Sequence, residues 1–277
     1  MAPGMIIRAC ALISVGLMGF MPIAAPAQDT PYIAEPWRYG RNDDKNTLRY
    51  CIDPRDSEWK IAQDIAQQIA AALLLEPAPK MIEDKRVTAG WDVLYTHLLT
   101  DCDVYFGFKL IPGVYPGWVT LTRPYYASTY VFAVTDPSWQ SLADIPPDRP
   151  IATAIGTSAD FSFIKYLQTL PPARQWPRFP MGTNEDALAA LSKGTAAAAL
   201  VWGPAVWAAK EANPAYADLR LIAPDPLPPT TLNMGAAMLG NQSFLRSNVD
   251  RAISELTADG TIAAILKDHA FPAEPVP

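Results

Sequence analysis

The chain has 277 residues, of which 50% are hydrophobic and 18% are charged, and its formal net charge is −6. This balance excludes a disordered or collagen-like chain, and the acidic total argues against a nucleic-acid-binding protein held by phosphate contacts. The 28 prolines, about one residue in ten and roughly twice the usual share, make long uninterrupted helices rare. The composition therefore indicates a compact, loop-rich globular protein.

The first 27 residues have the features of a cleavable secretory signal peptide. Arg8 provides a short positive region, residues 9–20 form an apolar run, and Ala25 and Ala27 offer a small-x-small cleavage site. The apolar run is too short for a stable membrane anchor. We therefore expect a protein that is exported to an oxidising compartment, most naturally a bacterial periplasm.

Two cysteines, Cys51 and Cys102, follow the predicted cleavage site. An even pair in an exported protein is more often a disulfide than two free thiols, and this pair would close a loop of about fifty residues, for which chain entropy gives about 4 kcal/mol. The alternative is a thiolate nucleophile or a metal ligand. It has little support because the only histidines, His97 and His269, are not spaced as its partners.

The first half of the chain shows a strand and helix alternation after an extended N-terminal arm, residues 28–46. This order predicts a sheet of parallel strands connected by crossover helices. Such sheets bind ligands at the carboxyl ends of their strands. The predicted elements are a strand at 48–52, a helix at 58–75, a strand around 80–82, a helix at 92–99 and a strand at 102–107.

A long aromatic and β-branched run at 125–134 is typical of a strand that connects two lobes. A second alternation follows, and residues 232–239 return the chain to the first lobe. Two α/β lobes joined by two crossing strands describe a hinged clamp. The remaining predicted elements are strands at 151–155, 196–201 and 219–222, and helices at 160–170, 184–193, 205–212 and 248–269.

Three motifs in order resemble the type II periplasmic solute-binding proteins of family 3, which usually serve amino-acid importers. They are a D-x-x-x-G strand beginning at Asp103, the sequence Leu-Thr-Arg-Pro-Tyr-Tyr at 121–126, and a Gly-Thr turn at 156–157. The resemblance implies lobe 1 at 47–131 and 233–277, and lobe 2 at 132–232. Each lobe would be an α/β sandwich, and residues 125–134 would be one of the hinge strands.

A narrower resemblance is to the MoxJ/XoxJ type of proteins, which accompany quinoprotein alcohol dehydrogenases. It rests on Leu-Arg-x-Cys-x-Asp-Pro at 48–54, the segment at 102–104 and the run at 122–132, including the cysteine pair. The group is regarded as periplasmic accessory factors of methanol dehydrogenase. The loop at 55–59 is shorter here than in that group, which puts the floor of the cleft in doubt.

An amino-acid receptor of this family needs a buried cation and a carboxylate for the two charges of its ligand. The stretch at 110–118, where the family has an arginine, contains none. The strand at 196–201 is followed by Trp202-Gly203-Pro204 where a carboxylate is expected. Both charge partners are therefore missing at the family positions, which argues against α-amino-acid binding.

An aromatic and weakly polar set around the cleft remains as the predicted binding surface. Aromatic faces suit a planar or apolar ligand or a protein interface, and the open alternative is that they simply pack beneath the sheet edges. Arg123 either reaches the cleft or is exposed at a strand start, and Asp53 either lines the cleft edge or only forms a turn. The aromatic candidates are Trp59, Phe108, Tyr115, Trp118, Tyr125, Tyr126 and Trp202.

The turn at Gly156, Thr157 and Ser158 is a second candidate because backbone N–H groups at a helix N-terminus bind anions. Asp160 would then replace the missing partner of a ligand ammonium, although an acid in a first helical turn is favoured by the helix dipole anyway. The alternative is that these residues only cap the helix.

Enzyme motifs are sparse, so the sequence predicts no catalytic residue, no metal site and no cofactor. Two functions stay open. One is an accessory protein of a periplasmic quinoprotein alcohol dehydrogenase, acting by partner contact or by small-ligand binding. The other is the receptor of an ABC importer, working with its permease, for an organic anion or a modified amino acid.

Overall fold

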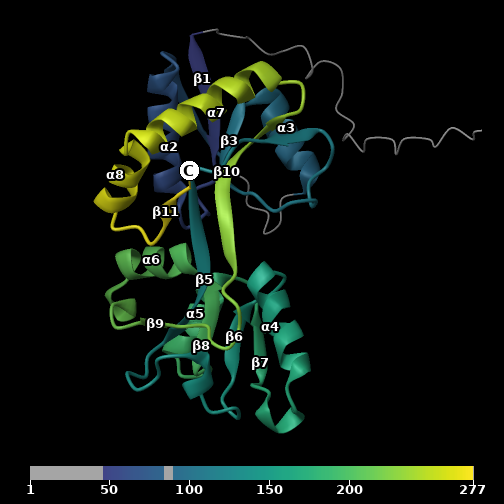
Figure 1. Cartoon of the computed structure of the whole chain (residues 1–277), viewed down its shortest axis with the longest axis vertical. Helices are drawn as coiled ribbons and strands as arrows, with labels where there is room; N and C mark the ends of the chain where they lie inside the picture. Colours follow the sequence, from purple (N-terminus) through teal and green to yellow (C-terminus); the bar gives the residue numbers. More distant parts are fainter. Residues whose placement is uncertain (1–45, 84–89, 277) are drawn as a thin grey trace, which may run out of the picture.

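The computed structural model describes residues 46–83 and 90–276. The predicted signal peptide, and the N-terminal arm up to residue 45, lie outside the described residues. Figure 1 shows two lobes joined by the long strands β5 (Tyr126–Val134) and β10 (Thr231–Leu239). Within the described residues, no helix is long and apolar enough to cross a membrane.

Lobe 1 is built on a sheet whose parallel part has the order β2-β1-β3, followed by the antiparallel strand β10. Helices α2, α7 and α8 contact one another, whereas α3 packs with β10 around the disulfide. The elements are β1 (Thr47–Ile52), α2 (Trp59–Ala72), β2 (Glu76–Met81), α3 (Trp91–Thr100), β3 (Val104–Lys109), β4 (Val119–Leu121), α7 (Ser243–Ala258) and α8 (Thr261–Asp268).

Helix α2 buries the stripe of apolar residues that predicts it. Ile61, Ile65 and Ile69 are fully buried and lie one turn apart on the face that packs on the sheet. The helix ends at Ala72, three residues before the predicted end, because Leu74 takes a left-handed backbone with φ of 57°. The predicted end was wrong because no glycine marks this turn.

Edge strands and a helix break are the main departures from the predicted elements. β2 begins at Glu76 and contains Pro77 and Pro79, and β7 (Arg178–Met181) contains Pro180; both are outer strands of their sheets, where a missing N–H is tolerated. The prolines explain why β7 was not predicted. The helix predicted at 248–269 is two helices, because Gly260 has φ of 85° and ends α7.

Lobe 2 contains the parallel strands β7, β6 and β8, with the antiparallel strands β5 and β9 beyond β8. Helix α5 lies against β6 and β8, and α6 follows β8 directly. The elements are β6 (Ile151–Ala154), α4 (Ser158–Thr169), α5 (Asn184–Ser192), β8 (Ala198–Trp202), α6 (Gly203–Ala212) and β9 (Arg220–Ile222).

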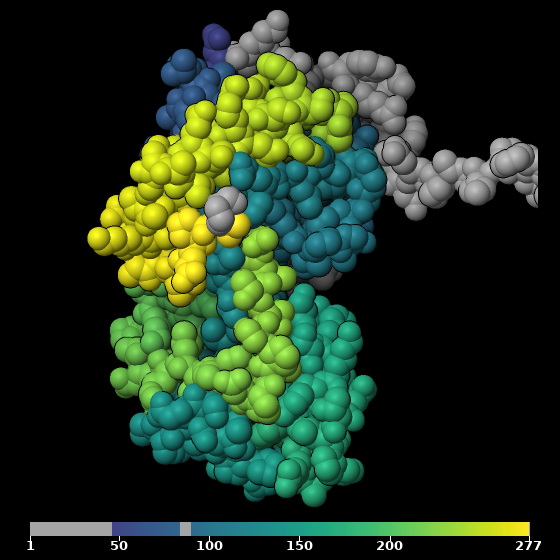
Figure 2. Space-filling view, in the orientation of Figure 1, coloured from purple at the N-terminus to yellow at the C-terminus, as the bar shows by residue number. Residues whose placement is uncertain are grey.

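The two lobes are connected where β5 exchanges partners. Its first half pairs with β10, and from Tyr130 onward it pairs with β8 of lobe 2. The hydroxyl oxygens of Thr129 and Thr231 lie 2.8 Å apart at the crossing. Figure 2 shows the molecule narrowing at this level, between the two lobes. The short strand β11 (Glu274–Pro275) also pairs with β5 on the lobe 1 side.

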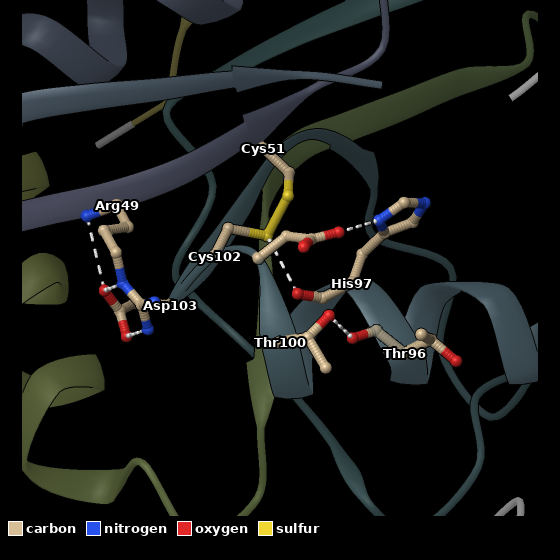
Figure 3. The surroundings of a disulfide bond; sticks show 8 residues. Arg49, Cys51, Thr96, His97, Thr100, Cys102 and Asp103 are labelled. Carbon is tan, nitrogen blue, oxygen red and sulfur yellow. Dashed lines mark hydrogen bonds and ion pairs between the residues drawn. A yellow bond between two sulfur atoms is a disulfide. The ribbon is translucent and has the colours of Figure 1, made fainter. Parts of the chain in front are cut away.

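The predicted disulfide between Cys51 and Cys102 is confirmed, with the two α-carbons 5.6 Å apart. It joins β1 to the turn that precedes β3, and both cysteines are fully buried among Leu94, Leu98 and Trp118. Figure 3 shows the bridge above α3, with the ion pair between Arg49 of β1 and Asp103, the residue before β3, to one side. The bridge therefore fixes the strand that leads into the cleft.

Candidate functional site

A cavity of about 170 Å³ lies between the two lobes, at the carboxyl ends of β1, β3, β6, β7 and β8. This is the position at which open parallel sheets present their ligand sites. Lobe 1 contributes the turn after β1, residues 53–58, here called the lobe-1 turn, together with the end of β3. The lining residues are Arg55, Asp56, Ser57, Glu58, Lys109, Ala154, Ile155, Thr157, Gly182, Thr183, Asn184, Glu185 and Trp202.

A hydrogen bond crosses the cavity from lobe 2 to lobe 1. The indole Nε1–H of Trp202 donates to Oε1 of Glu58 at 3.0 Å, and both residues are at most 2% exposed. The backbone N–H of Trp202 donates to Oδ1 of Asn184 at 3.0 Å, and the ring packs on Tyr130 at 4.9 Å between centroids. A buried donor and a buried acceptor thus satisfy each other across the lobe boundary.

Lys109, the last residue of β3, lies against the same tryptophan. Its Nζ is 5.1 Å from the ring centroid of Trp202, which is within the range of a cation–π contact. The hydroxyl of Tyr115 donates to the carbonyl oxygen of Lys109 and so fixes the backbone at this point. The lysine and the tryptophan both line the cavity between the lobes.

Two carboxyl groups of the lobe-1 turn, those of Asp56 and Glu58, have raised pKa values. Burial, and then the charge of Glu58, raise the pKa of Asp56 to about 7. Burial also raises the pKa of Glu58, although Lys109 and the Trp202 donor oppose that shift. Burial lowers the pKa of Lys109, but the carboxylate of Glu58, followed by smaller effects of its other neighbours, outweighs it and leaves the pKa raised. Lys109 is therefore a charged ammonium at neutral pH.

Asp53, a predicted site residue, is held within the lobe-1 turn. Its Oδ1 accepts from the backbone N–H of Arg55, and its carboxylate accepts from the Arg55 guanidinium at 2.5 to 3.1 Å. Asp53 is 7% exposed. This internal pairing takes up the charge of Asp53, whereas Asp56 and Glu58, three and five residues later, face the cavity.

The predicted anion-binding turn, residues 156–160, here called the lobe-2 turn, caps helix α4. The Gly156 N–H donates to Oδ2 of Asp160 at 3.1 Å, and Oγ1 of Thr157 accepts from the Asp160 N–H at 3.1 Å. Arg178 donates to both oxygens of Asp160 at 2.7 and 2.8 Å. The turn therefore contains its own anion, Asp160, which is 1% exposed. Thr157 also lines the cavity, and Ser158 begins α4.

The predicted aromatic residues are spread over several places. Trp202 is the one that lines the cavity between the lobes. Trp59 lines a separate hollow of about 610 Å³ beside Trp207, and Phe108 lines another of about 160 Å³ beside Trp91. Tyr115 contacts both Trp91 and Phe108 through its ring.

The other three aromatic residues are buried inside lobe 1, and Arg123 is bonded through its backbone to helix α7. Trp118 is buried against Tyr95, with ring centroids 4.8 Å apart. Tyr125 is fully buried; its hydroxyl donates to the carbonyl oxygen of Gly235 at 2.8 Å. Tyr126, which belongs to the same aromatic run, is also fully buried. The backbone N–H of Arg123 donates to Asp250 on α7 at 2.7 Å.

Sequence reasoning missed the charged residues of the cavity, which are Arg55, Asp56, Glu58, Lys109 and Glu185. Lys109 lies one position before the stretch at 110–118, in which the resemblance places the family arginine. A lone lysine directly after Gly107 and Phe108, at the end of a buried strand, is the signal that would have found it. The expectation that the cleft lacks both charge partners is therefore wrong for the cavity, although it holds at the family positions.

No group of histidine, cysteine, aspartate and glutamate in the described part of the chain is arranged to hold a metal ion. The cavity is lined instead by the indole ring of Trp202 and by the charged side chains of Arg55, Asp56, Glu58, Lys109 and Glu185. Charged groups of both signs are the kind that pair with a charged ligand.

No protein-family model and no curated protein matches the sequence. Among solved structures, MxaJ from Methlophaga aminisulfidivorans has a TM-score of 0.59 at 18% identity, covering 83% of this chain and 100% of its own. The fold is that of the type II periplasmic binding proteins. The predicted fold class, two α/β lobes with two crossing strands, is thereby confirmed.

Other type II binding proteins agree. The GluR0 ligand-binding core, in complex with L-glutamate, has a TM-score of 0.58 at 14% identity and covers 80% of this chain and 97% of its own. A mutant of the arginine-binding protein of T. maritima has a TM-score of 0.53 at 20% identity, and the match covers 81% of this chain and 95% of that protein. At these identities the likeness concerns the fold.

Proposed function

We propose that this protein is an exported accessory factor of a periplasmic quinoprotein alcohol dehydrogenase system, and that it acts mainly by contact with its partner. The resemblance of its sequence to the MoxJ/XoxJ group, together with the fold that it shares with MxaJ, supports this proposal. A signal peptide at residues 1–27 and a periplasmic location belong to the same proposal.

The observation that carries the proposal is the closure of the cleft by the protein's own side chains. Trp202 and Glu58 bond across the lobes, Lys109 covers the indole, and about 170 Å³ remains, which is below the range of about 300–1,000 Å³ usual for ligand pockets. A nutrient receptor depends on an open cleft that closes on its ligand. A factor that acts through its surface has no such need.

The alternative proposal is the receptor of an ABC importer, working with a permease. It is favoured by the opposite charges of the cavity, since Lys109 could pair with a carboxylate and Asp56 and Glu58 with an ammonium once the lobes separate. Those groups, with Thr157 and Trp202, are then the proposed ligand contacts. A modified amino acid fits this set better than a simple organic anion does, because the carboxylates would repel the anion.

One native mass spectrum of the mature protein recovered from periplasm separates the two proposals. We expect a protein without a bound small molecule that carries a subunit of the quinoprotein dehydrogenase, identified by its mass. A retained small molecule with no dehydrogenase subunit would overturn the accessory function in favour of the receptor. The same spectrum gives the mass of the mature chain. That mass identifies the first residue and so tests the predicted cleavage after Ala27.

A further inference from the structure

We propose that Lys109 is a tethered surrogate ligand, whose ammonium occupies a site for a primary alkylammonium group formed by both lobes. The site would accept a free alkylammonium ion if the lysine side chain were removed. This inference goes beyond the proposed function and does not depend on a dehydrogenase partner.

The aromatic wall of the site comes from lobe 2. The Lys109 Nζ lies 5.1 Å from the centre of the Trp202 ring, and Tyr130 packs against the same ring at 4.9 Å. An ammonium within about 6 Å of a tryptophan ring is attracted by its electron-rich face, more strongly where water is excluded. Because Trp202 is 1% exposed, this contact is made in a largely desolvated place.

The carboxylate wall comes from lobe 1. Glu58 is 2% exposed, and the charges of Glu58 and Asp56 both act on the Lys109 ammonium. A buried carboxylate that keeps its charge is costly unless a cation lies nearby, so the Lys109 ammonium stabilises the charged forms of both acids. One oxygen of Glu58 also holds the Trp202 indole, which ties the carboxylate wall to the aromatic wall.

A second lysine shows that a nearby tryptophan is not enough to make such a site. The Nζ of Lys60 lies 5.6 Å from the ring of Trp59, but Lys60 is exposed and lines the separate hollow beside α6. Trp59 and Lys60 also come from the same lobe. Lys109 differs because its ammonium lies in a cavity bounded by carboxylates and connects lobe 1 to lobe 2.

The arrangement gives the two lobes a direct contact through their own side chains. Binding proteins with two hinged lobes close when a ligand contacts both. Here β3 of lobe 1 delivers the ammonium to β8 of lobe 2, so the chain itself provides the contact. The tether makes the local concentration of this ammonium high, and a free alkylammonium must compete with it.

The test uses the full mature protein and the variant Lys109→Ala, with n-propylammonium chloride as the probe, since its three carbons and nitrogen replace the atoms removed. By calorimetry, we expect the variant to bind n-propylammonium at least about tenfold more tightly than the wild type does, which corresponds to about 1.4 kcal/mol. The neutral 1-propanol should not bind. Lys60→Ala is the matched control and should behave as the wild type.

Two further measurements keep the proposal falsifiable. Glu58→Gln added to Lys109→Ala should weaken binding of the probe by at least about tenfold, because the carboxylate wall loses the charge of Glu58. If Lys109→Ala does not fold, Lys109→Met retains the stem without the charge, and its thermal midpoint should be higher in ammonium chloride than in equimolar sodium chloride. Equal binding by variant and wild type, equal binding of propanol, or an equal response of Lys109→Met to both salts would overturn the proposal.

Discussion

The lobe-1 turn and the lobe-2 turn occupy equivalent places, each at the carboxyl end of a parallel strand and before a helix, yet they use their carboxylates in opposite ways. In the lobe-2 turn, Asp160 is bonded by Arg178 and by the Gly156 N–H. In the lobe-1 turn, Asp56 and Glu58 face the cavity between the lobes. The Asp160 carboxylate therefore stabilises its own lobe, whereas Asp56 and Glu58 form part of the candidate site.

The directions of the pKa shifts express this difference. Burial alone would raise the pKa of Asp160, but the hydrogen bonds from Arg178 and other donors hold it below its usual value. Asp56 lacks such bonds to the same extent, so burial raises its pKa to about 7. The pKa values of Asp160 and Asp56 thus shift in opposite directions, because Arg178 bonds to Asp160 and, in the described part of the chain, no arginine bonds in this way to Asp56.

The largest expected effect concerns the bond that anchors the lobe-1 turn. Replacing both Cys51 and Cys102 by alanine removes the cross-link of a loop with 51 residues of separation, and should lower the free energy of unfolding by about 4 kcal/mol. Urea denaturation measures this loss. Reduction of the wild-type protein should give a similar loss, and a change below about 1 kcal/mol in both experiments would show that the turn is held without the bridge.

Breaking the ion pair of the lobe-2 turn should have the next largest effect. Asp160→Ala leaves Arg178 and the Gly156 N–H without their acceptor, and should lower the free energy of unfolding by about 3 kcal/mol at pH 7. Because the pKa of Asp160 is lowered on folding, its contribution is present above the ordinary pKa of about 3.9 and is lost as acid protonates the carboxylate.

Asp186→Ala is the matched control for that variant. Asp186 holds the same position in α5 as Asp160 does in α4, three residues after a threonine cap, but it is exposed. Its loss should cost about 0.5 kcal/mol, through the helix dipole alone. If both variants lost the same stability, the ion pair with Arg178 would not be what distinguishes the lobe-2 turn.

The smallest change in the free energy of unfolding is expected for a substitution at Asp56. This substitution should stabilise the protein, whereas the two changes above destabilise it. Since folding raises the pKa of Asp56 to about 7, the wild type loses stability as the pH rises from about 4 to about 7. Asp56→Asn removes this cost and should be more stable than the wild type by roughly 1–2 kcal/mol at pH 8, because partial exposure of the side chain screens the full shift.

Urea titrations at pH 4 and pH 8 measure the effect of Asp56→Asn. At pH 4 the variant and the wild type should agree, since the carboxyl group is then neutral in the folded protein. Glu76→Gln, which alters an exposed acid on the edge strand β2, is the control and should show no such pH dependence. A variant less stable than the wild type at pH 8 would mean that a charged Asp56 is needed to hold the lobe-1 turn.

The sequence by itself determined the order of the elements, the two-lobed α/β fold and the disulfide. Each depends on signals close together in the chain, such as the stripe of Ile61, Ile65 and Ile69 on α2, or on a small number of residues of one kind, such as the two cysteines. The edge strand β7, the proline-containing start of β2 and the left-handed turn at Leu74 escaped prediction because their backbone is decided by neighbours in space.

Only the tertiary structure decided which residues meet between the lobes. Glu58 and Trp202 are 144 residues apart, and no local pattern says that an indole will bond to that carboxylate or that Lys109 will cover the ring. Nor does composition tell that Asp160 has Arg178 as its partner while Asp56 faces a cavity. The reason is physical: the charge state and role of a buried acid depend on the donors that folding brings to it.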